Sequence, residues 1–263
     1  MTAPGNKAAL RSAIERYETL AIAVSGGVDS MTLAEFAHHH TKTRTLMVHA
    51  SSPAVPADAG ERVRVFAARL GWELHLTDAG ELADSRYRAN PVDRCYFCKT
   101  NLYQRIRELT EVPIASGANL DDLDDYRPGL LAAKEWGVVH PFIEAGFTKP
   151  AVRALARALG LDDLAELPAQ PCLASRIETA IPVETADLAF IDRVEQAAAA
   201  IAGRAATIRC RITHAGVVLE LDPAPEAGAA LTRRLASLCS ETGRRFLGIR
   251  PYRRGSAFLR PGT

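Results

Sequence analysis

The segment Ser25-Gly26-Gly27-Val28-Asp29-Ser30 constrains the fold of this chain more than any other. It follows an apolar run at residues 20–24 and precedes a stretch with helical periodicity at residues 31–37. A strand that turns into a helix through Ser-Gly-Gly presents backbone N–H groups to an anion. Glycines let a phosphate approach the backbone, and the two serine hydroxyls add donors. We therefore predict a loop that binds the phosphates of ATP, rather than an ordinary glycine turn.

Asp29 is the unexpected residue of this loop. A carboxylate repels phosphates unless a divalent cation lies between them, so its presence predicts a Mg²⁺ ion. We accordingly assign Asp29 to metal binding and catalysis. Five neighbouring residues are assigned to the nucleotide: Ser25, Gly26, Gly27, Val28 and Ser30.

The first 160 residues alternate β-rich apolar runs with longer helical patterns. Such alternation predicts right-handed βαβ units and a parallel sheet covered on both faces. The expected fold class is α/β, a Rossmann-like parallel sheet of about five strands whose ligands lie beyond the carboxyl ends of the strands. The expected strands are residues 20–24, 45–49, 73–77, 113–117 and 138–142, and the expected helices are residues 30–40, 57–70, 96–109, 128–135 and 149–159.

The pattern changes after Gly160. A loop at residues 167–171 leads into Cys172, and a helix–strand–strand–helix–strand order follows. The expected elements are residues 185–202, 206–212, 217–221, 225–239 and 245–250. We predict a nucleotide-binding domain at residues 1–180 and a small α+β domain at residues 181–263 that serves substrate binding or oligomerisation.

Composition narrows the class of protein. A net charge of +1 gives no general reason to expect nucleic acid or membrane binding. No apolar stretch approaches the ~20 residues of a membrane span, and residues 1–20 lack the apolar core of a signal peptide. Five cysteines without such a signal suggest a reducing cytoplasm, where catalysis or metal binding is favoured over structural disulfides.

Three cysteines form a candidate constellation. Cys95 and Cys98 make a C-x-x-C, and Cys172 stands alone in the loop after the first domain. The pair by itself is compatible with a redox site, half a zinc site or two buried thiols. Three thiolates brought together would suit a [4Fe–4S] cluster with one iron open to another ligand. Cys210 and Cys239, on an expected strand and an expected helix, are interpreted as core residues.

Charged residues supply further candidates. Asp121 or Asp122 is a candidate to join Asp29 near Mg²⁺, because their acidic loop follows the fourth expected strand. Arg176, close to Cys172, is a candidate to bind a phosphate or to lower the pKa of the thiol. Arg209 and Arg211 share one face of a strand and form a candidate phosphate pocket. The remaining members of the acidic loop and of the arginine set are Asp124, Asp125, Arg250, Arg253 and Arg254.

Segments in order along nearly the whole chain resemble the ATP-dependent sulfur transferases of the LarE type, members of the ATP-pyrophosphatase (PP-loop) superfamily. These enzymes act in synthesis of the nickel-pincer nucleotide cofactor. SGGVDS marks only the superfamily, whereas DDYRPG and CLASRI are much more specific. The matching segments are SGGVDS (25–30), NPVDRCYFCK (90–99), GANLDDLDDYRPGLLAAKEWGV (117–138), PFIEAGFTKPAVRALARALGL (141–161), PAQPCLASRI (168–177) and YRRGS (252–256).

The resemblance implies a two-step reaction. ATP adenylates a carboxylate of pyridinium-3,5-biscarboxylic acid mononucleotide and releases pyrophosphate, and sulfur then replaces AMP to give a thiocarboxylate. The loop and Mg²⁺ would offset the charge that develops between the α- and β-phosphates. His49, at the end of the second expected strand, is expected beside the adenosine. A homo-oligomer is also expected.

The family divides over its sulfur source. Some members sacrifice the sulfur of the cysteine that matches Cys172, which becomes dehydroalanine. Others hold a [4Fe–4S] cluster whose open iron binds the transferred sulfide, supplied by sulfide or another sulfur donor. Because Cys95 and Cys98 accompany Cys172, the cluster version is favoured here. Cys172, Asp29 and Arg176 are the predicted catalytic residues.

Two other classes of enzyme use the same ATP-binding loop but act on different substrates. An iron–sulfur-dependent tRNA thiolase would need an extended basic surface, against which the charge balance argues. An ammonia-using amide ligase of the GMP or NAD synthetase type would need neither Cys172 nor the C-x-x-C pair.

Overall fold

The computed structural model describes every residue except 1–4, 125–126, 204–205, 223–227, 254 and 258–263. The chain divides into two compact units. Unit 1 contains Met1–Ser52, Ala57–Glu81 and Cys95–Ala169, and unit 2 contains Pro53–Pro56, Leu82–Arg94 and Gln170–Thr263. Unit 2 therefore takes two segments from the first half of the chain and begins its main part at Gln170, whereas the sequence suggested a boundary at residue 181.

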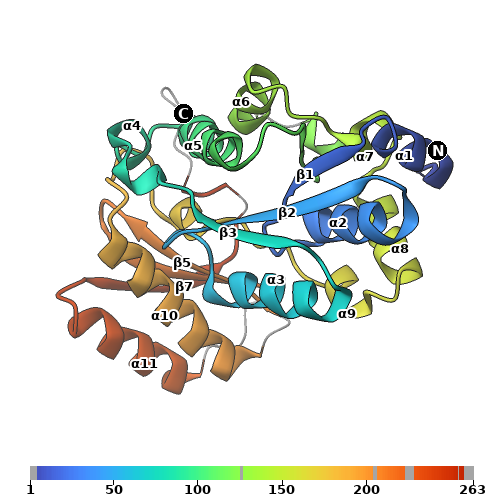
Figure 1. Cartoon of the computed structure of the whole chain (residues 1–263). Coiled ribbons are helices and arrows are strands. Elements are labelled where there is room, and N and C mark those ends of the chain that lie inside the picture. The colour runs from blue at the N-terminus through green and yellow to red at the C-terminus, as the bar shows by residue number, and fades with distance from the viewer. Residues whose placement is uncertain (1–4, 125–126, 204–205, 223–227, 254, 258–263) are drawn as a thin grey trace. The chain divides into compact units, whose positions relative to one another are not determined.

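Unit 1 contains a parallel sheet of strand order β3-β2-β1-β4 (Figure 1). The Rossmann-like α/β class is thus confirmed. Strand order reverses between β1, paired with β2 on one side, and β4 on the other, which is where open α/β sheets bind ligands. The strands are β1 (Thr19–Ala23), β2 (Arg44–Ser51), β3 (Leu74–Asp78) and β4 (Ile114–Ala115).

The fifth expected strand, residues 138–142, is reduced to a single bridge between Ala115 and Val139. Pro141 ends the pairing because it has no backbone N–H, and it starts the short helix α7 (Pro141–Glu144) instead. The prediction of a full strand here is wrong for that reason.

Alternating residues of the strands enter two apolar clusters, as expected for a sheet covered on both faces. Leu20, Ile22 and Met47 belong to one, and Ala21 and Val48 belong to the other. Figure 1 shows α5 and α6 on one side of the sheet and α2, α3 and α8 on the other. The unit 1 helices are α1 (Lys7–Ile14), α2 (Val28–His40), α3 (Ala57–Leu70), α5 (Arg94–Leu109, whose first residue belongs to unit 2), α6 (Pro128–Glu135), α7, α8 (Lys149–Ala158) and α9 (Asp162–Ala165), with 3₁₀ turns η1 (Glu81–Ala83, shared with unit 2) and η2 (Leu120–Asp122).

Unit 2 has the expected helix–strand–strand–helix–strand order. Strands β5 and β6 are antiparallel, β6 and β7 are parallel, and α10 and α11 lie together on one side of the sheet (Figure 1). Because side chains alternate along β5, Ile208, Cys210 and Ile212 share one face, and Arg209 and Arg211 share the other. The elements are α4 (Ser85–Arg88), η3 (Leu173–Arg176), α10 (Thr185–Ala202), β5 (Thr207–Thr213), β6 (Gly216–Asp222), α11 (Ala229–Ser240) and β7 (Phe246–Pro251).

Within the described part of the chain, no helix combines the length and the apolar composition needed to cross a membrane.

Candidate functional site

The loop that connects β1 to α2 lies at the carboxyl end of the sheet of unit 1. The backbone N–H of Ser25 donates to Oγ of Ser30 at 3.0 Å, and the two hydroxyl oxygens are 3.1 Å apart. Ser25 is exposed, whereas Ser30 is buried at the start of α2. Contacts between the two serines therefore hold the two ends of the loop together. The free N–H groups in the first turn of the thirteen-residue helix α2 can bind an anion.

The two glycines of the loop have different requirements. Gly26 has φ +79°, and a Cβ atom there would lie 2.5 Å from the carbonyl oxygen of Ala59 on α3, so the fold itself requires glycine. Gly27 has φ −86°, and an added Cβ would meet only Oγ of Ser25 at 3.5 Å. The folded chain has room for alanine at residue 27. A glycine there is what close approach of a ligand to the backbone requires.

Asp29 lies in the first turn of α2, where two side chains from distant segments contact its carboxylate. Nζ of Lys149 donates to Oδ2, and Nδ2 of Asn119 donates to Oδ1 at 3.3 Å. Burial raises the pKa of the Asp29 carboxyl, and the ammonium of Lys149 opposes that effect. Oxygen atoms of this kind fit Mg²⁺, but magnesium binding by Asp29 stays a prediction.

The acidic loop after β4 presents one carboxylate toward Asp29. Asp122 accepts from the backbone N–H of Asn119 at 3.0 Å, pairs with Arg127 at 3.1 Å, and acts electrostatically to raise the pKa of Asp29. Asp121 is exposed, and its backbone N–H donates to Asn119. The geometry thus favours Asp122 over Asp121 as the second acid of the site. Asp125 lies outside the described residues.

Three further residues shape this loop and were not found from the sequence. A Cβ atom on Gly117 would lie 2.6 Å from the backbone nitrogen of Ser30, so the end of β4 passes directly against the start of α2. Arg62 of α3 donates to the carbonyl of Gly26 at 2.7 Å. Lys149 supplies a cation from the first residue of α8. In the sequence, residue 149 stood out only as the start of an expected helix within the matching segment 141–161.

His49 contacts the backbone just before the loop. Its Nδ1 donates to the carbonyl of Val24 at 2.8 Å, and the side chain is buried. Burial lowers the pKa of the imidazole, so the ring is neutral at pH 7. His49 therefore joins the ends of β1 and β2, and contact with an adenosine stays a prediction.

Cys95 and Cys98 lie in the first two turns of α5 as half-buried thiols. Residues three apart on a helix are neighbours on its surface, so this spacing suits two thiols that bind the same metal ion or cluster. Cys172 is also a half-buried thiol but belongs to unit 2. Within the described ranges, no group of three or more His, Cys, Asp or Glu side chains is arranged around a metal position. The thiols suit an iron–sulfur cluster in chemical kind, and their joint ligation stays a prediction.

Cys172 immediately precedes η3, and Arg176 at the end of η3 holds this turn in place. The guanidinium donates to the carbonyls of Pro171 and Cys172 at 2.5 and 3.1 Å and to Oγ of Ser175 at 3.1 Å. It also makes a bidentate pair with Glu195 of α10, both contacts at 2.9 Å. Since Arg176 is 2% exposed, these contacts position the Cys172 loop. Direct contact of Arg176 with a substrate stays a prediction.

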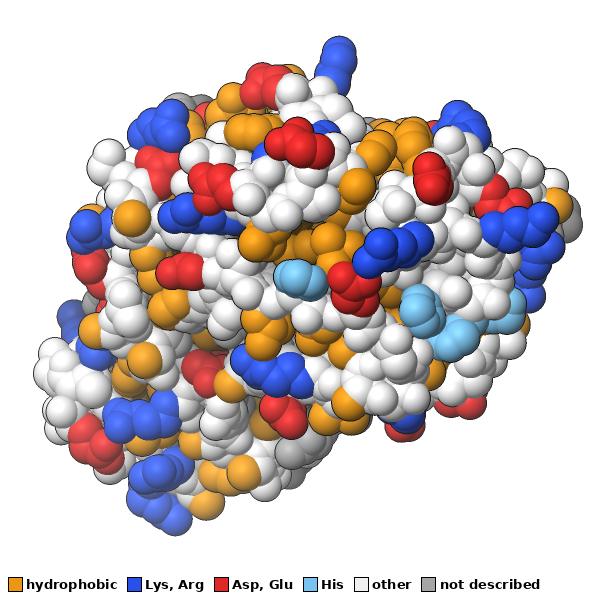
Figure 2. Space-filling model, viewed as in Figure 1, with side chains coloured by type: hydrophobic (Ala, Val, Ile, Leu, Met, Phe, Trp, Pro, Cys, Tyr) orange, Lys and Arg blue, Asp and Glu red, His pale blue; other side chains and the backbone are white. Residues whose placement is uncertain are grey.

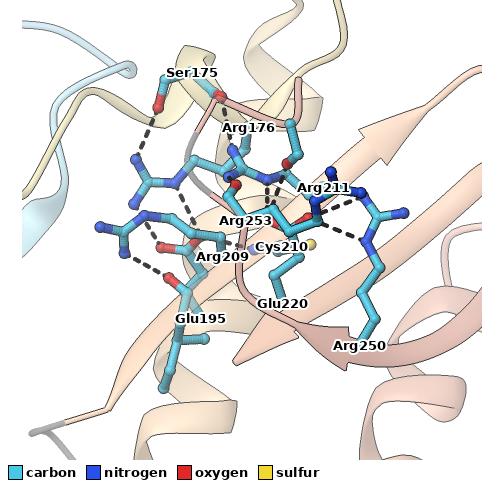
Figure 3. Close-up of polar contacts among 11 residues, drawn as sticks. Ser175, Arg176, Glu195, Arg209, Cys210, Arg211, Glu220, Arg250 and Arg253 are labelled. Atoms are coloured by element: carbon cyan, nitrogen blue, oxygen red, sulfur yellow. Dashed lines mark hydrogen bonds and ion pairs between the residues drawn. The ribbon is translucent and has the colours of Figure 1, made fainter. Parts of the chain in front are cut away.

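The same loop rests on the arginine face of the small sheet (Figure 3). Arg211 donates to the carbonyl of Ser175 at 3.0 Å and to Glu220 at 2.8 Å. Glu220 is fully buried and also accepts from Arg250 at 2.9 and 3.1 Å and from Ser256 at 3.0 Å. The backbone carbonyl of Arg253 accepts from Arg211 at 3.5 Å. Arg254, the last residue of the predicted pocket, lies outside the described residues.

Arg209 lies on the same face of β5 as Arg211. Burial, followed by the nearby charge of Arg176, lowers the pKa of its guanidinium to about 10. Its Nη1 donates to the carbonyl of Ile208 at 2.6 Å, and the ring of Tyr252 is 5.9 Å from its central carbon. An anion placed here would relieve the repulsion between arginines. Sequence reasoning thus selected Cys172, Arg176, Arg209 and Arg211, and unit 2 brings all four together.

Cys210 and Cys239 are core residues. They are 0% and 1% exposed, and burial raises the pKa of both thiols. Neither is presented for chemistry.

Charge differs sharply between the units. Unit 2 carries sixteen arginines, eleven acidic residues and no lysine, a net charge of +5. Unit 1 contains all five lysines of the chain and has a net charge of −4. Positive charge is therefore concentrated on the unit that carries Cys172.

A parallel sheet with a serine–glycine loop at the point where its strand order reverses places unit 1 in the Rossmann-like α/β class, with a loop of anion-binding type.

No protein-family model matches the chain. It is 35% identical over 190 residues to the uncharacterised protein slr1717 of Synechocystis, covering 71% of this chain and 70% of that protein. It is 31% identical over 160 residues to pyridinium-3,5-bisthiocarboxylic acid mononucleotide synthase of Lactiplantibacillus plantarum, covering 59% of this chain and 58% of the synthase. The chain therefore belongs to one family with slr1717 and is similar to a LarE-type sulfur transferase.

A third relative, the uncharacterised protein MJ0830 of Methanocaldococcus jannaschii, is 25% identical over 185 residues, covering 69% of each chain.

Proposed function

We propose that this chain is an ATP-dependent sulfur transferase that converts carboxylates of pyridinium-3,5-biscarboxylic acid mononucleotide into thiocarboxylates. The observation that carries the proposal is the placement of Cys172 on a turn that Arg176 and Arg211 hold against a buried arginine face. A sulfur atom beside clustered guanidinium groups suits delivery of sulfur to a phosphorylated substrate. Similarity to the L. plantarum synthase, together with that protein's name, supports the choice of acceptor.

Unit 1 would perform the activation. A carboxylate oxygen is a poor leaving group, whereas AMP leaves readily from an acyl adenylate. Backbone N–H groups at the start of α2 and the exposed hydroxyl of Ser25 would bind the phosphates of ATP. Asp29, with Asp122 beside it, would hold Mg²⁺, which neutralises charge on the departing pyrophosphate. The products of this half-reaction are the acyl adenylate and pyrophosphate.

Unit 2 would bind the mononucleotide and supply sulfur. Arg209, with Arg211 next to it, would take the substrate phosphate, since an anion there lowers the repulsion that the arginines impose on each other. In the sacrificial route, the sulfur of Cys172 attacks the acyl carbon and AMP leaves with the bonding electron pair. Loss of the Cys172 α-proton then breaks the Cβ–S bond, which leaves dehydroalanine and the thiocarboxylate.

In the cluster route, which we favour, Cys95, Cys98 and Cys172 would hold a [4Fe–4S] cluster. When bound, the cluster would supply sulfide at an iron without a protein ligand. Cys172 would then remain intact through repeated turnovers. A sulfide or another sulfur donor would replace the transferred atom.

Mass spectrometry of protein and product together separates these routes. The chain is reconstituted anaerobically with iron and sulfide, its iron is counted, and it is then incubated with ATP, Mg²⁺ and the mononucleotide. Cluster delivery predicts iron binding that is lost in Cys95→Ala, Cys98→Ala and Cys172→Ala, and unchanged protein mass after turnover. Failure to bind iron, together with loss of H₂S from Cys172, would establish the sacrificial route instead. Cys239→Ala is the matched control because that thiol is buried away from the loop.

The two alternative acceptors are tested in the same assay. Labelled sulfur that enters tRNA rather than the mononucleotide would indicate a tRNA thiolase. On the face of unit 1 that Figure 2 shows, acidic and basic side chains are interspersed, which does not favour a long polyanion there. Full activity of a triple Cys→Ala variant with ammonia would indicate an amide ligase.

A further inference from the structure

Strand β4 is the shortest strand that the structure describes in unit 1, yet it leads into the segment that contacts the phosphate-binding loop. It contains two residues, Ile114–Ala115. Residues 117–122 follow almost directly. Within them, Asn119 donates through its side chain to Asp29 and through its backbone N–H to Asp122. Two strand residues provide few ladder hydrogen bonds, so contacts beyond the strand are needed to fix this segment.

The main-chain pairing of β4 ends where this segment begins. Ala115 and Val139 form a single bridge, and the backbone N–H of Ser116 donates to the carbonyl of Val139 at 3.1 Å. Pro141 has no backbone N–H with which to extend the ladder. The next pair of residues is joined through side chains instead, because Oγ of Ser116 and Nδ1 of His140 are 2.9 Å apart. This contact continues the pairing of β4 by one step.

The donor and acceptor in this pair are assigned from their surroundings. The backbone N–H of Ala118 donates to Oγ of Ser116 at 3.4 Å, which leaves the hydroxyl proton for Nδ1 of His140. Burial lowers the pKa of His140 despite the opposing charges of Glu144 and Asp122, so the ring is neutral at pH 7. A neutral ring that accepts at Nδ1 carries its proton on Nε2. His140 thus sets the direction of the Ser116 hydroxyl, which in turn holds the N–H of Ala118.

Gly117 makes the position of this turn important for the site. A Cβ atom on Gly117 would lie 2.6 Å from the backbone nitrogen of Ser30 and 2.7 Å from the carbonyl carbon of Asp29. The backbone at residue 117 is therefore packed against the first turn of α2. A displacement of residues 116–118 would move Asn119 relative to the carboxylate of Asp29.

We infer that His140 is a positioning residue of the proposed magnesium and phosphate site. Through the hydroxyl of Ser116 it holds residues 117–122 against the start of α2, so that the carboxylates of Asp29 and Asp122 stay near each other. The inference rests on the proposed use of ATP with Mg²⁺. It adds a residue that supports the metal site from outside both the Ser25–Ser30 loop and the acidic segment.

Calorimetric titration with ATP, in Mg²⁺ and again in EDTA, tests this role without turnover. His140→Leu removes the acceptor of the Ser116 hydroxyl proton, whereas His140→Asn keeps an oxygen acceptor on a side chain of similar reach. His140→Leu should weaken ATP binding in Mg²⁺ about fivefold, with less than about a twofold change in EDTA. His140→Asn should recover most of the affinity. A loss confined to the Mg²⁺ titration identifies a change at the carboxylates rather than at the backbone donors of α2.

His38→Leu is the matched control. His38 and Thr45 form a contact of the same kind in unit 1, with Nδ1 and Oγ1 2.9 Å apart, and burial lowers the pKa of His38 as well. That pair lies at the other end of α2 from Asp29. His38→Leu should therefore leave both titrations unchanged. Urea unfolding of the two leucine variants compares their stabilities.

The outcomes separate the inference from the proposed function. If wild type binds no ATP, or binds it equally with and without Mg²⁺, the proposed use of ATP with Mg²⁺ fails and the inference fails with it. If wild type depends on Mg²⁺ and His140→Leu keeps its affinity, or loses it equally in EDTA, only the role of His140 is overturned. Affinity of His140→Asn as low as that of His140→Leu would overturn it too. Ser116→Ala provides a second variant if His140→Leu does not fold: it should show the same Mg²⁺-dependent loss, and wild-type affinity would contradict the inference.

Discussion

The two units build their candidate sites from different materials. In unit 1 the site is a backbone turn whose exposed and half-buried residues, Ser25, Gly27 and Asp29, make few contacts that the fold needs. In unit 2 the site is a set of buried side chains, with Arg176, Arg211 and Glu220 each joined to several partners. Backbone donors keep their direction without side-chain packing, whereas clustered guanidinium groups must be held apart and neutralised. Removal of a unit 1 residue should therefore affect binding, and removal of a unit 2 residue should also affect stability.

The largest expected effect comes from Cys172. Cys172→Ala should lower thiocarboxylate formation on the order of a hundredfold or more, because the sulfur donor or a cluster ligand is lost. Stability should change little, since the thiol is only half buried. Product is measured by mass spectrometry and stability by urea unfolding. A loss of activity explained entirely by unfolding would contradict the assignment.

Glu220 tests whether buried charge holds unit 2 together. Glu220→Gln should lower the free energy of unfolding by about 2–4 kcal/mol, because Arg211 and Arg250 lose their shared carboxylate. Burial alone would raise the pKa of Glu220, but contacts with Arg211, Ser256 and Arg250 lower it overall.

The sign of the pH dependence follows from that lowered pKa. The stabilisation by Glu220 is present above the pKa of the unfolded carboxyl, about 4.5, and is lost as pH falls through the lower folded value. The stability difference between wild type and Glu220→Gln should therefore shrink below about pH 4.5. Urea unfolding at a series of pH values measures it. A difference that stays constant to low pH would show that charge at residue 220 is unimportant.

Gly27 tests the opposite expectation for unit 1. Gly27→Ala should remain folded, with stability within ~1 kcal/mol of wild type, because its φ is negative and the added Cβ has room. Affinity for ATP should fall about tenfold, ~1.4 kcal/mol, since the methyl group blocks close approach of a phosphate. Gly26→Ala is the matched variant and should be destabilised by strain against Ala59. Equal effects of the two substitutions would remove the distinction between them.

The smallest effect is expected at the surface of unit 2. Arg88 and Glu184 form an ion pair at 2.6 Å, but both side chains are about half exposed. Arg88→Gln should cost less than ~1 kcal/mol, because solvent and salt screen the pair. Comparison with Glu220→Gln in the same unfolding assay shows how far burial, rather than charge itself, sets the cost. A loss as large as that of Glu220→Gln would contradict this explanation.

Local sequence patterns predicted most of the fold. The limits of α3, α6 and α10 agree with the expected ranges, because helical periodicity, and the proline that starts α6, can be read from consecutive residues. The prediction of a strand at residues 138–142 was wrong. The apolar run suggested a strand, but Pro141 limits the pairing to a single bridge between Val139 and Ala115. Periodicity alone does not contain that steric limit.

Site prediction had a different limit. Ser25–Ser30 and the residues around Cys172 are contiguous motifs, so their composition identified them. Asn119 and Lys149 contact Asp29 across 90 and 120 residues, and nothing near either residue names the partner. Gly117 likewise reads as an ordinary glycine until the backbone of α2 is placed against it. Chain topology, rather than local propensity, creates these contacts.

The absence of lysine from unit 2 has a chemical consequence. Guanidinium groups stay protonated across the physiological range, and acetylation of lysine side chains has no target on this half of the sequence. Acetylation of lysine therefore cannot change the charge of unit 2. Reagents that acylate side-chain amines would report on unit 1 alone, with Lys149 among their five targets.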